Sequence, residues 1–208
     1  MLNQNHGPAA VWLYRHGPLA IHKYQCVGWS DVPLEDPEKT AREARQLAAF
    51  MREPVTVYSS DLLRVRQTAT PLVDALGLQA RWSKALRELN FGEWEGRLWT
   101  DLHNEDAPRF AEFMRDWRTT SAPGGESFSQ VQDRVADFWA EVAATHRDEV
   151  IVLVSHGGTL AALAILLLGW THERAMERML ERGHFGLIDF RRGGYAWNFS
   201  PAKLPPPT

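Results

Sequence analysis

The sequence predicts an α/β fold in which a mostly parallel sheet lies between two layers of helices. Three short apolar runs, at residues 11–14, 55–58 and 150–154, have the length and composition of buried strands. Each run is followed by a short loop and then by a segment with helical spacing. Repeated strand, loop and helix units favour parallel pairing with helices on both faces, so we expect a three-layer α/β/α sandwich.

The elements follow in order along the chain. The first strand ends at Arg15 and His16, and a helix begins after Asp36, an N-cap residue followed by Pro37. The second strand leads into a helical pattern that closes near Gly77. The third strand leads into an apolar helix over residues 159–168. These three units supply the predicted parallel part of the sheet.

The remaining segments complete the expected domain. Residues 99–118 and 128–146 have helical patterns, separated by a Pro-Gly-Gly breaker at 123–125, and we expect this helical excursion to cover the active-site end of the sheet. Residues 185–190 and 195–199 resemble a hairpin. We therefore expect one domain over residues 1–200 and a loose, Pro-rich tail over residues 201–208.

Composition narrows the classes of partner. The net charge of −3 gives no general attraction to nucleic acid or to an anionic membrane, so an anionic substrate needs a local cluster of positive groups. Cys26 is the single cysteine, which excludes an intrachain disulfide, and the longest apolar run, residues 160–168, is too short to cross a bilayer. We expect a cytoplasmic protein without nucleic-acid or membrane partners, and leave a homodimer open.

Charged side chains follow the predicted strands where ligands gather in open α/β sheets. Arg15 and His16 end the first strand, Arg64 lies one turn into the helix after the second, and His156 follows the third. Two arginines and two histidines should therefore converge on one crevice. Arginine forks match phosphate oxygens, so the crevice suits a phosphoryl group.

The nucleophile follows from elimination. A cysteine-based phosphatase needs an arginine six residues after its cysteine, where this chain has Val32, and no close aspartate pair follows the first strand. The acidic cluster from Asp101 to Asp106 lies in a polar helical region, which favours a solvated surface over a metal site. A neutral imidazole can attack phosphorus, so a histidine remains as the credible nucleophile, although His16 taken alone fits a hydrogen-bonded structural histidine as well.

Five motifs occur in order along the chain. They are Arg-His-Gly at 15–17, the stretch 59–69 around Arg64, Leu-Arg-Glu-Leu-Asn-Phe-Gly-Glu-Trp-Glu-Gly at 86–96, Pro-Gly-Gly-Glu-Ser at 123–127, and Ser-His-Gly-Gly at 155–158. Over residues 11 to about 190 this resembles the histidine phosphatase superfamily, also called the phosphoglycerate mutase-like family. The resemblance is closest to alpha-ribazole phosphatases and broad-specificity relatives in the phosphatase branch.

The resemblance implies roles for individual residues. It makes His16 the nucleophile that becomes a phosphohistidine, Arg15, Arg64 and His156 the phosphate clamp, and Glu88 the proton donor, with Glu93 and Glu95 as rival acids. It also implies hydrolysis of a small phosphorylated metabolite, with no metal and no cofactor. The expected substrate-binding residues are Arg15, His22, Gly28, Arg64, His156 and Gly157.

Departures and alternatives remain. Members of the family commonly have Glu or Gln where Pro18 stands and Asn where His22 stands, and Gly28 fits either a close backbone approach or a simple turn. The stretch 28–32 is similar to mutases, which transfer the phosphoryl group to a second hydroxyl, but mutases usually carry an arginine where Ala161 stands. A second alternative is a non-catalytic module that binds phosphorylated ligands.

Overall fold

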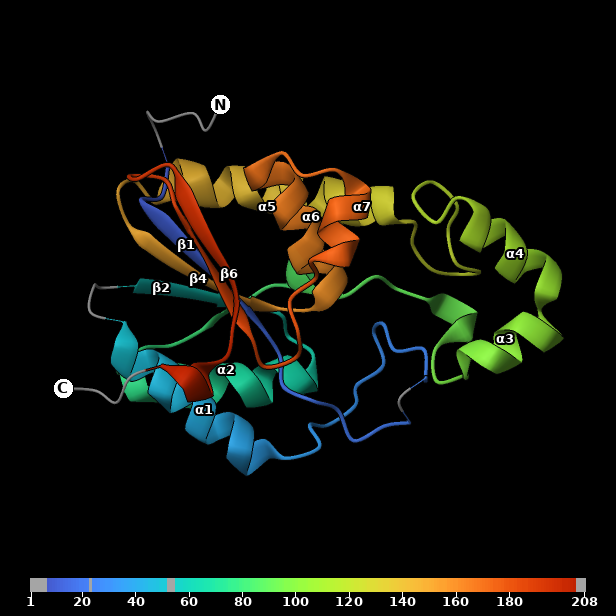
Figure 1. The fold of residues 1–208 in the computed structure, drawn as a ribbon, viewed down its shortest axis with the longest axis horizontal. Coiled ribbons are helices and arrows are strands. Elements are labelled where there is room, and N and C mark those ends of the chain that lie inside the picture. Colours follow the sequence, from blue (N-terminus) through green and yellow to red (C-terminus); the bar gives the residue numbers. More distant parts are fainter. Residues whose placement is uncertain (1–6, 23, 52–54, 205–208) are drawn as a thin grey trace.

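The computed structural model describes residues 7–22, 24–51 and 55–204, and these form a three-layer α/β/α sandwich (Figure 1). Within the described residues the central sheet has six strands in the order β3-β2-β4-β1-β5-β6. Strands β3, β2, β4 and β1 pair in parallel, while β5 and β6 form the antiparallel hairpin that the sequence predicts. The strands are β1 (Ala10–Arg15), β2 (Val55–Ser59), β3 (Arg81–Trp82), β4 (Val150–Ser155), β5 (Phe185–Asp189) and β6 (Gly194–Phe199).

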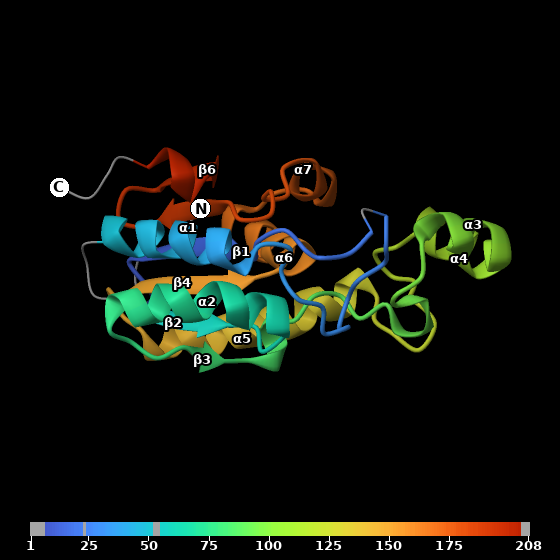
Figure 2. The same cartoon turned by 90° about the horizontal axis from the view of Figure 1, so that it is seen from below.

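Helices cover both faces of the sheet, as Figure 2 shows from below. Helices α1 (Pro37–Phe50) and α2 (Leu63–Leu76) lie on one face, and α5 (Phe128–Thr145) and α6 (Gly157–Leu168) lie on the other, followed by the short α7 (His172–Glu177). Asp36 caps α1 by accepting the Lys39 amide at 2.8 Å. Gly77 ends α2 with a left-handed φ of 67°, which only glycine adopts without cost.

Alternation along β1 and β4 explains why both faces are covered. Val11 and Leu13 pack with Ile151 and Leu153 under α5 and α6. Tyr14 packs with Val152 and Val154 under α1 and α2, in a separate cluster. Because both faces of the two central strands bury apolar side chains, their sequences read as continuous apolar runs.

The helical excursion differs in part from the expectation. The segment 99–118 divides into α3 (Trp99–Glu105) and α4 (Ala107–Arg115) at Asp106, whose carboxylate accepts from Trp94 and Arg109 at 2.7 Å each. Pro108 lies in the first turn of the second helix, where a proline is tolerated, and it does not continue the first helix. These two helices extend beyond the end of the sheet (Figure 1), whereas α5 runs along its face, so the expectation that residues 128–146 cover the end is wrong.

The C-terminal tail is packed where it begins. Pro201–Lys203 forms one turn of 3₁₀ helix, Pro201 is buried, and Gln46 of α1 donates to the Leu204 carbonyl at 3.2 Å. The expectation of a loose tail is therefore wrong for residues 201–204, because proline and leucine bury apolar surface against α1. Residues 205–208 lie outside the described part of the chain. Among the described residues, no helix combines the length and apolarity that a membrane span requires.

Candidate active site

Two histidines meet at the carboxyl end of the sheet because β1 and β4 are neighbours in register. Arg15 pairs with Ser155, so His16 and His156 leave the two strands side by side. Their ring centroids lie 5.2 Å apart and both rings are buried. The structure thus brings the two predicted histidines together, with Arg64 of α2 beside them.

The tautomer of His16 is set by its neighbour in the chain. Its Nδ1 lies 2.7 Å from the Gly17 carbonyl oxygen, which can only accept, so Nδ1 carries the hydrogen. Burial, reinforced by the positive charges of Arg64 and Arg15, holds the pKa of His16 well below its usual value. His16 is therefore a neutral imidazole with an unprotonated Nε2, the form that can act as a nucleophile.

Arg64 is buried and held by three acceptors. It donates Nε to His156 Nδ1 at 3.2 Å, NH1 to the Ser30 carbonyl at 2.8 Å and NH2 to the Gly28 carbonyl at 2.6 Å. Burial lowers its pKa to about 10, which still leaves the guanidinium charged near neutral pH. Of its five N–H groups, two remain for a ligand, and they belong to a guanidinium whose orientation is fixed.

His156 has both ring nitrogens engaged by the protein. Nδ1 accepts from Arg64, so the hydrogen is on Nε2, which lies 2.9 Å from Ser60 Oγ. Burial and the nearby Arg64 charge hold its pKa well below the usual value. This geometry makes His156 a support for the orientation of Arg64, and its direct contact with phosphate stays a prediction.

Arg15 offers an unused donor. Its NH1 donates to the Leu180 carbonyl at 2.5 Å, but within the described residues its buried Nε has no hydrogen-bond partner. A buried unpaired donor is costly, and an anion is the natural acceptor. Gly157 is required beside it, because a Cβ there would lie 2.8 Å from Arg15 Cζ and 2.5 Å from Met179 Sδ.

Glu88 lies across from these groups at the first turn of α6. Its Oε2 accepts the Gly158 amide at 3.3 Å, and its charge acts on Arg15, Arg64 and Arg182. The backbone of Glu88 is fixed from two sides. Its carbonyl accepts from Trp29 Nε1 at 2.7 Å and from Arg134 at 2.9 Å. The carboxyl group is therefore presented from a braced segment.

The rival acids are engaged elsewhere. Glu95 accepts the Trp29 amide at 2.6 Å and the Ser30 amide at 2.5 Å, and also binds the Ser30 hydroxyl, so it anchors the loop that holds Arg64. Glu93 is exposed and pairs with Arg109 at 2.9 Å. These contacts favour structural roles for both.

Gly28 contacts Arg64 of the candidate site, whereas His22 lies exposed in the same loop. A Cβ on Gly28 would lie 2.3 Å from the Leu89 carbonyl oxygen, so this glycine permits a close backbone approach rather than a simple turn. The approach is to residues 89–91, and the Gly28 carbonyl contacts Arg64. His22 lies exposed in the same loop, where its ring contacts Tyr24, and binding of substrate by His22 stays a prediction.

Three further residues support the site, and none of them was singled out individually from the sequence. Ser60 fixes the His156 ring, Arg134 braces the Glu88 backbone, and Arg182 is an exposed arginine whose charge reaches His16, Arg15 and Arg64. Ser60 lies in a motif noted above, next to Asp61. Arg134 and Arg182 reach the site only through long-range folding.

Cys26 and the acidic cluster around Asp106, the other candidates considered from the sequence, make contacts that stabilise the fold. Cys26 is buried beside Trp94 and Leu102, and burial raises the pKa of its thiol, which leaves it inert as a nucleophile near neutral pH. Asp106 from the acidic cluster serves Trp94 and Arg109. Across the described ranges, no three His, Cys, Asp or Glu side chains gather as ligands of a metal would.

Comparison with known proteins decides the family. The model of the histidine phosphatase superfamily, branch 1, matches residues 11–200. The chain belongs to this superfamily. As a histidine phosphatase it is an enzyme of the phosphatase class, and its fold is phosphoglycerate mutase-like.

The similar proteins include phosphatases that are named for two different substrates. The adenosylcobalamin/alpha-ribazole phosphatase of Salmonella typhimurium is 30% identical over 186 residues, 88% of this chain and 91% of the relative. The crystal structure of the alpha-ribazole phosphatase from Shigella flexneri has a TM-score of 0.78 at 27% identity, covering 90% of this chain and 94% of its own. A mycobacterial glucosyl-3-phosphoglycerate phosphatase, solved with VO3, has a TM-score of 0.77 at 28% identity and covers 92% of this chain and 100% of its own.

Proposed function

We propose that this histidine phosphatase hydrolyses a phosphate monoester of a small metabolite through a phosphohistidine on His16. The observation that carries the proposal is the fixed tautomer of His16, which presents an unprotonated Nε2 beside Arg15 and Arg64. The printed names of its relatives, an alpha-ribazole phosphatase and a glucosyl-3-phosphoglycerate phosphatase, support a small phosphorylated substrate.

In the first step, Nε2 of His16 attacks phosphorus while the bond to the leaving oxygen breaks. Arg15 and Arg64 neutralise the charge on the other phosphate oxygens, and the buried Nε of Arg15 gains its missing acceptor. Glu88, protonated at this point, gives its proton to the leaving oxygen. The products are the alcohol and an Nε2-phosphorylated His16.

In the second step, water attacks the phosphorus of the phosphohistidine. The Glu88 carboxylate accepts a proton from the water, the nitrogen–phosphorus bond breaks, and its electron pair returns to Nε2. Inorganic phosphate leaves, and Glu88 is protonated again. Braced by Trp29 and Arg134, Glu88 can serve both steps from one position.

The structure also gives a reason for the similarity to mutases over residues 28–32 that requires no second hydroxyl. Gly28 and Ser30 supply the carbonyl groups that hold Arg64, and Asp31 accepts the Leu63 amide at the start of α2 at 2.5 Å. These contacts position a phosphate-binding arginine, which phosphatases and mutases both require. The stretch therefore supports phosphate binding without favouring transfer to a second hydroxyl.

The test is to trap the intermediate. We expect p-nitrophenyl phosphate, quenched within milliseconds in alkali, to leave an acid-labile phosphate on the peptide that contains His16. The His16→Asn variant should lose both the label and turnover. His103→Asn, an exposed histidine of α3, should keep both as the matched control.

Each other outcome would indicate a different function or reaction route for this protein. Phosphate on a serine or aspartate, or retained turnover in His16→Asn, would overturn the covalent route. Interconversion of 2- and 3-phosphoglycerate faster than release of phosphate would indicate the mutase. Tight binding of phosphate without turnover in the unmodified protein would indicate the non-catalytic module.

A further inference from the structure

An apolar pocket of about 450 Å³ opens beside Glu88. Helices α3, α4 and α7 and the segment after Glu88 contribute its walls, so the helical excursion builds most of it. The lining consists of apolar side chains apart from Glu88 and the glycine Gly158. Its main contributors are Phe91, Trp99, Phe110, Trp117, Met176 and Met179.

The pocket adjoins the residues proposed to bind phosphate. Gly158 lines it, and a Cβ at Gly158 would lie 2.6 Å from Glu88 Oε1. Met179 lines it too, and its sulfur borders Gly157 and thereby Arg15. With Glu88 as the proposed proton donor to the leaving oxygen, the group attached to that oxygen would lie next to this pocket.

The apolar lining of the pocket favours apolar groups over sugars. Among the residues of the pocket, Glu88 is the only ionisable one, so most sugar hydroxyls that entered would lose water without gaining a partner. Phe91 and Trp99 meet edge to face at 5.2 Å, and Trp99 and Phe110 lie 6.2 Å apart, which leaves ring faces and edges for a flat ligand. The flexible methionines can adjust to its outline.

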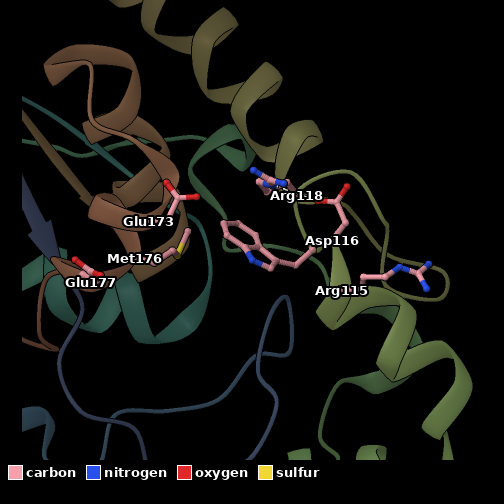
Figure 3. Close-up of a pocket in the computed structure, with 7 residues that line it drawn as sticks. Arg115, Asp116, Arg118, Glu173, Met176 and Glu177 are labelled. Carbon is pink, nitrogen blue, oxygen red and sulfur yellow. Dashed lines mark hydrogen bonds and ion pairs between the residues drawn. The ribbon is translucent and has the colours of Figure 1, made fainter.

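A second hollow next to this pocket has no charge pattern that would favour binding of a second anionic group. A hollow of about 550 Å³ shares Trp117 and Met176 with the apolar pocket. Figure 3 shows Glu173 and Glu177 of α7 on one side of it, and Arg115, Asp116 and Arg118 on the other. Arg118 is paired with Asp116 at 3.2 Å, so no uncompensated positive cluster faces the hollow. A carboxylate or second phosphate on the far end of the substrate would find little attraction there.

We propose that the preferred substrate is a phosphate monoester whose alcohol carries a flat, apolar ring system that fills the pocket beside Glu88. This assignment rests on the proposed phosphatase function and deepens it. The proposal predicts that the enzyme prefers such esters over phosphate esters of simple sugars and over phosphorylated acids.

The experiment compares esters of primary alcohols, whose leaving oxygens have similar basicity. Propyl phosphate, glucose 6-phosphate and 2-(2-naphthyl)ethyl phosphate are assayed for release of phosphate with the full chain. Burial of the naphthyl group predicts a kcat/KM on the order of 100-fold above that of propyl phosphate. Glucose 6-phosphate should not exceed propyl phosphate.

Methionine offers matched variants. Met114→Gln and Met176→Gln place an amide in the pocket with little change in volume, and the naphthyl-to-propyl ratio should fall about five- to tenfold in each. Met51→Gln, at the end of α1 on the other side of the sheet, should leave the ratio unchanged. The ratio is insensitive to loss of folded enzyme, because it divides out the concentration of active protein.

The outcomes separate the two proposals. If all three esters are hydrolysed with the same efficiency, or glucose 6-phosphate is preferred, the pocket assignment is wrong and the phosphatase function stands. If no ester is hydrolysed and no phosphohistidine forms, the function itself fails. A ratio that falls equally in Met51→Gln would also remove the pocket from the explanation.

Discussion

Nε of Arg64 donates a hydrogen bond to Nδ1 of His156 across 3.2 Å, in a buried contact between residues that are 92 positions apart. This bond couples the orientation of the guanidinium to the tautomer of the imidazole. Ser60 completes the arrangement from the opposite side of the ring. The arginine proposed to bind phosphate is thus oriented by residues that follow two different strands.

Arg64→Ala should reduce kcat/KM about 10- to 150-fold, since a charge-assisted hydrogen bond contributes about 1.5–3 kcal/mol. Arg64→Lys should recover little, because an ammonium cannot keep three directed contacts and still meet a ligand. Steady-state kinetics with p-nitrophenyl phosphate measures both. Arg66→Ala, an exposed arginine of the same helix stacked on Trp82, is the control and should behave as wild type. Equal rates in Arg64→Ala and wild type would place Arg64 outside the site.

Unfolding free energy should fall as the pH drops below about 6.5. His16 and His156 have folded-state pKa values well below their usual value, so in this range the unfolded chain binds protons that the folded chain excludes. Stability is thus fully present above the unfolded pKa and is lost as pH falls. Each imidazole contributes up to about 1.4 kcal/mol per pH unit. Denaturant titrations at pH 7.5 and 5.5 should show a smaller loss for His16→Asn than for wild type or His103→Asn; an identical loss in all three would contradict the assignment.

Glu88→Gln should damage cleavage of an alkyl phosphate about 10²–10⁴-fold more than formation of the phosphoenzyme from p-nitrophenyl phosphate. An alkoxide needs a proton to leave, whereas nitrophenolate leaves without one. The comparison uses pre-steady-state bursts, because Glu88 is also the proposed base that activates water in the second step. Glu93→Gln, exposed and paired with Arg109, is the control. If Glu93→Gln or Glu95→Gln shows the selective loss instead, Glu88 is not the donor.

Arg182→Gln should raise KM about three- to tenfold with a smaller change in kcat. The side chain is exposed, and its charge acts on Arg15, His16 and Arg64, so we expect it to attract the dianionic substrate through charge alone. The effect should shrink as salt rises, because exposed charges are screened. Arg178→Gln, exposed beyond the end of α7, serves as the comparison. A salt-independent loss of kcat would show that Arg182 contacts the reacting phosphate.

Activity should survive prolonged treatment with EDTA, since Arg15, Arg64 and the imidazole of His16 supply the charge and the nucleophile that a metal centre would otherwise provide. Initial rates before and after chelation and desalting measure this directly. Loss of activity that returns on addition of a divalent cation would refute the prediction.

Sequence patterns predicted the central strands and the helix ends, because these depend on the residues of the segment itself. Residues 11–14, 55–58 and 150–154 are strands because both faces of a central strand are buried, and Asp36 and Gly77 mark helix ends through their own backbone chemistry. Strand β3 has two exposed residues and α7 has six residues, too few to show a period. Such short elements exist because their neighbours hold them.

The site was predictable where a residue ends a strand and unpredictable where a long side chain arrives from elsewhere. Arg15, His16 and His156 follow directly from the strands that carry them. Arg134 reaches the Glu88 carbonyl from the middle of α5, and the apolar pocket needs α3, α4 and α7 assembled together. No spacing in the sequence encodes these approaches, because they depend on where whole helices pack.

The position of β1 in the sheet means that this strand can pair only after later parts of the chain have been synthesised. Its two neighbours are β4 (Val150–Ser155) and β5 (Phe185–Asp189), which follow much later in the sequence, whereas β1 leads directly into His16, the proposed nucleophile. A nascent chain that has not yet emerged through β4 leaves both edges of β1 without a strand to pair with. The proposed catalytic centre therefore cannot assemble before β4 and β5 have been synthesised, so a chain that stops before these strands should be inactive.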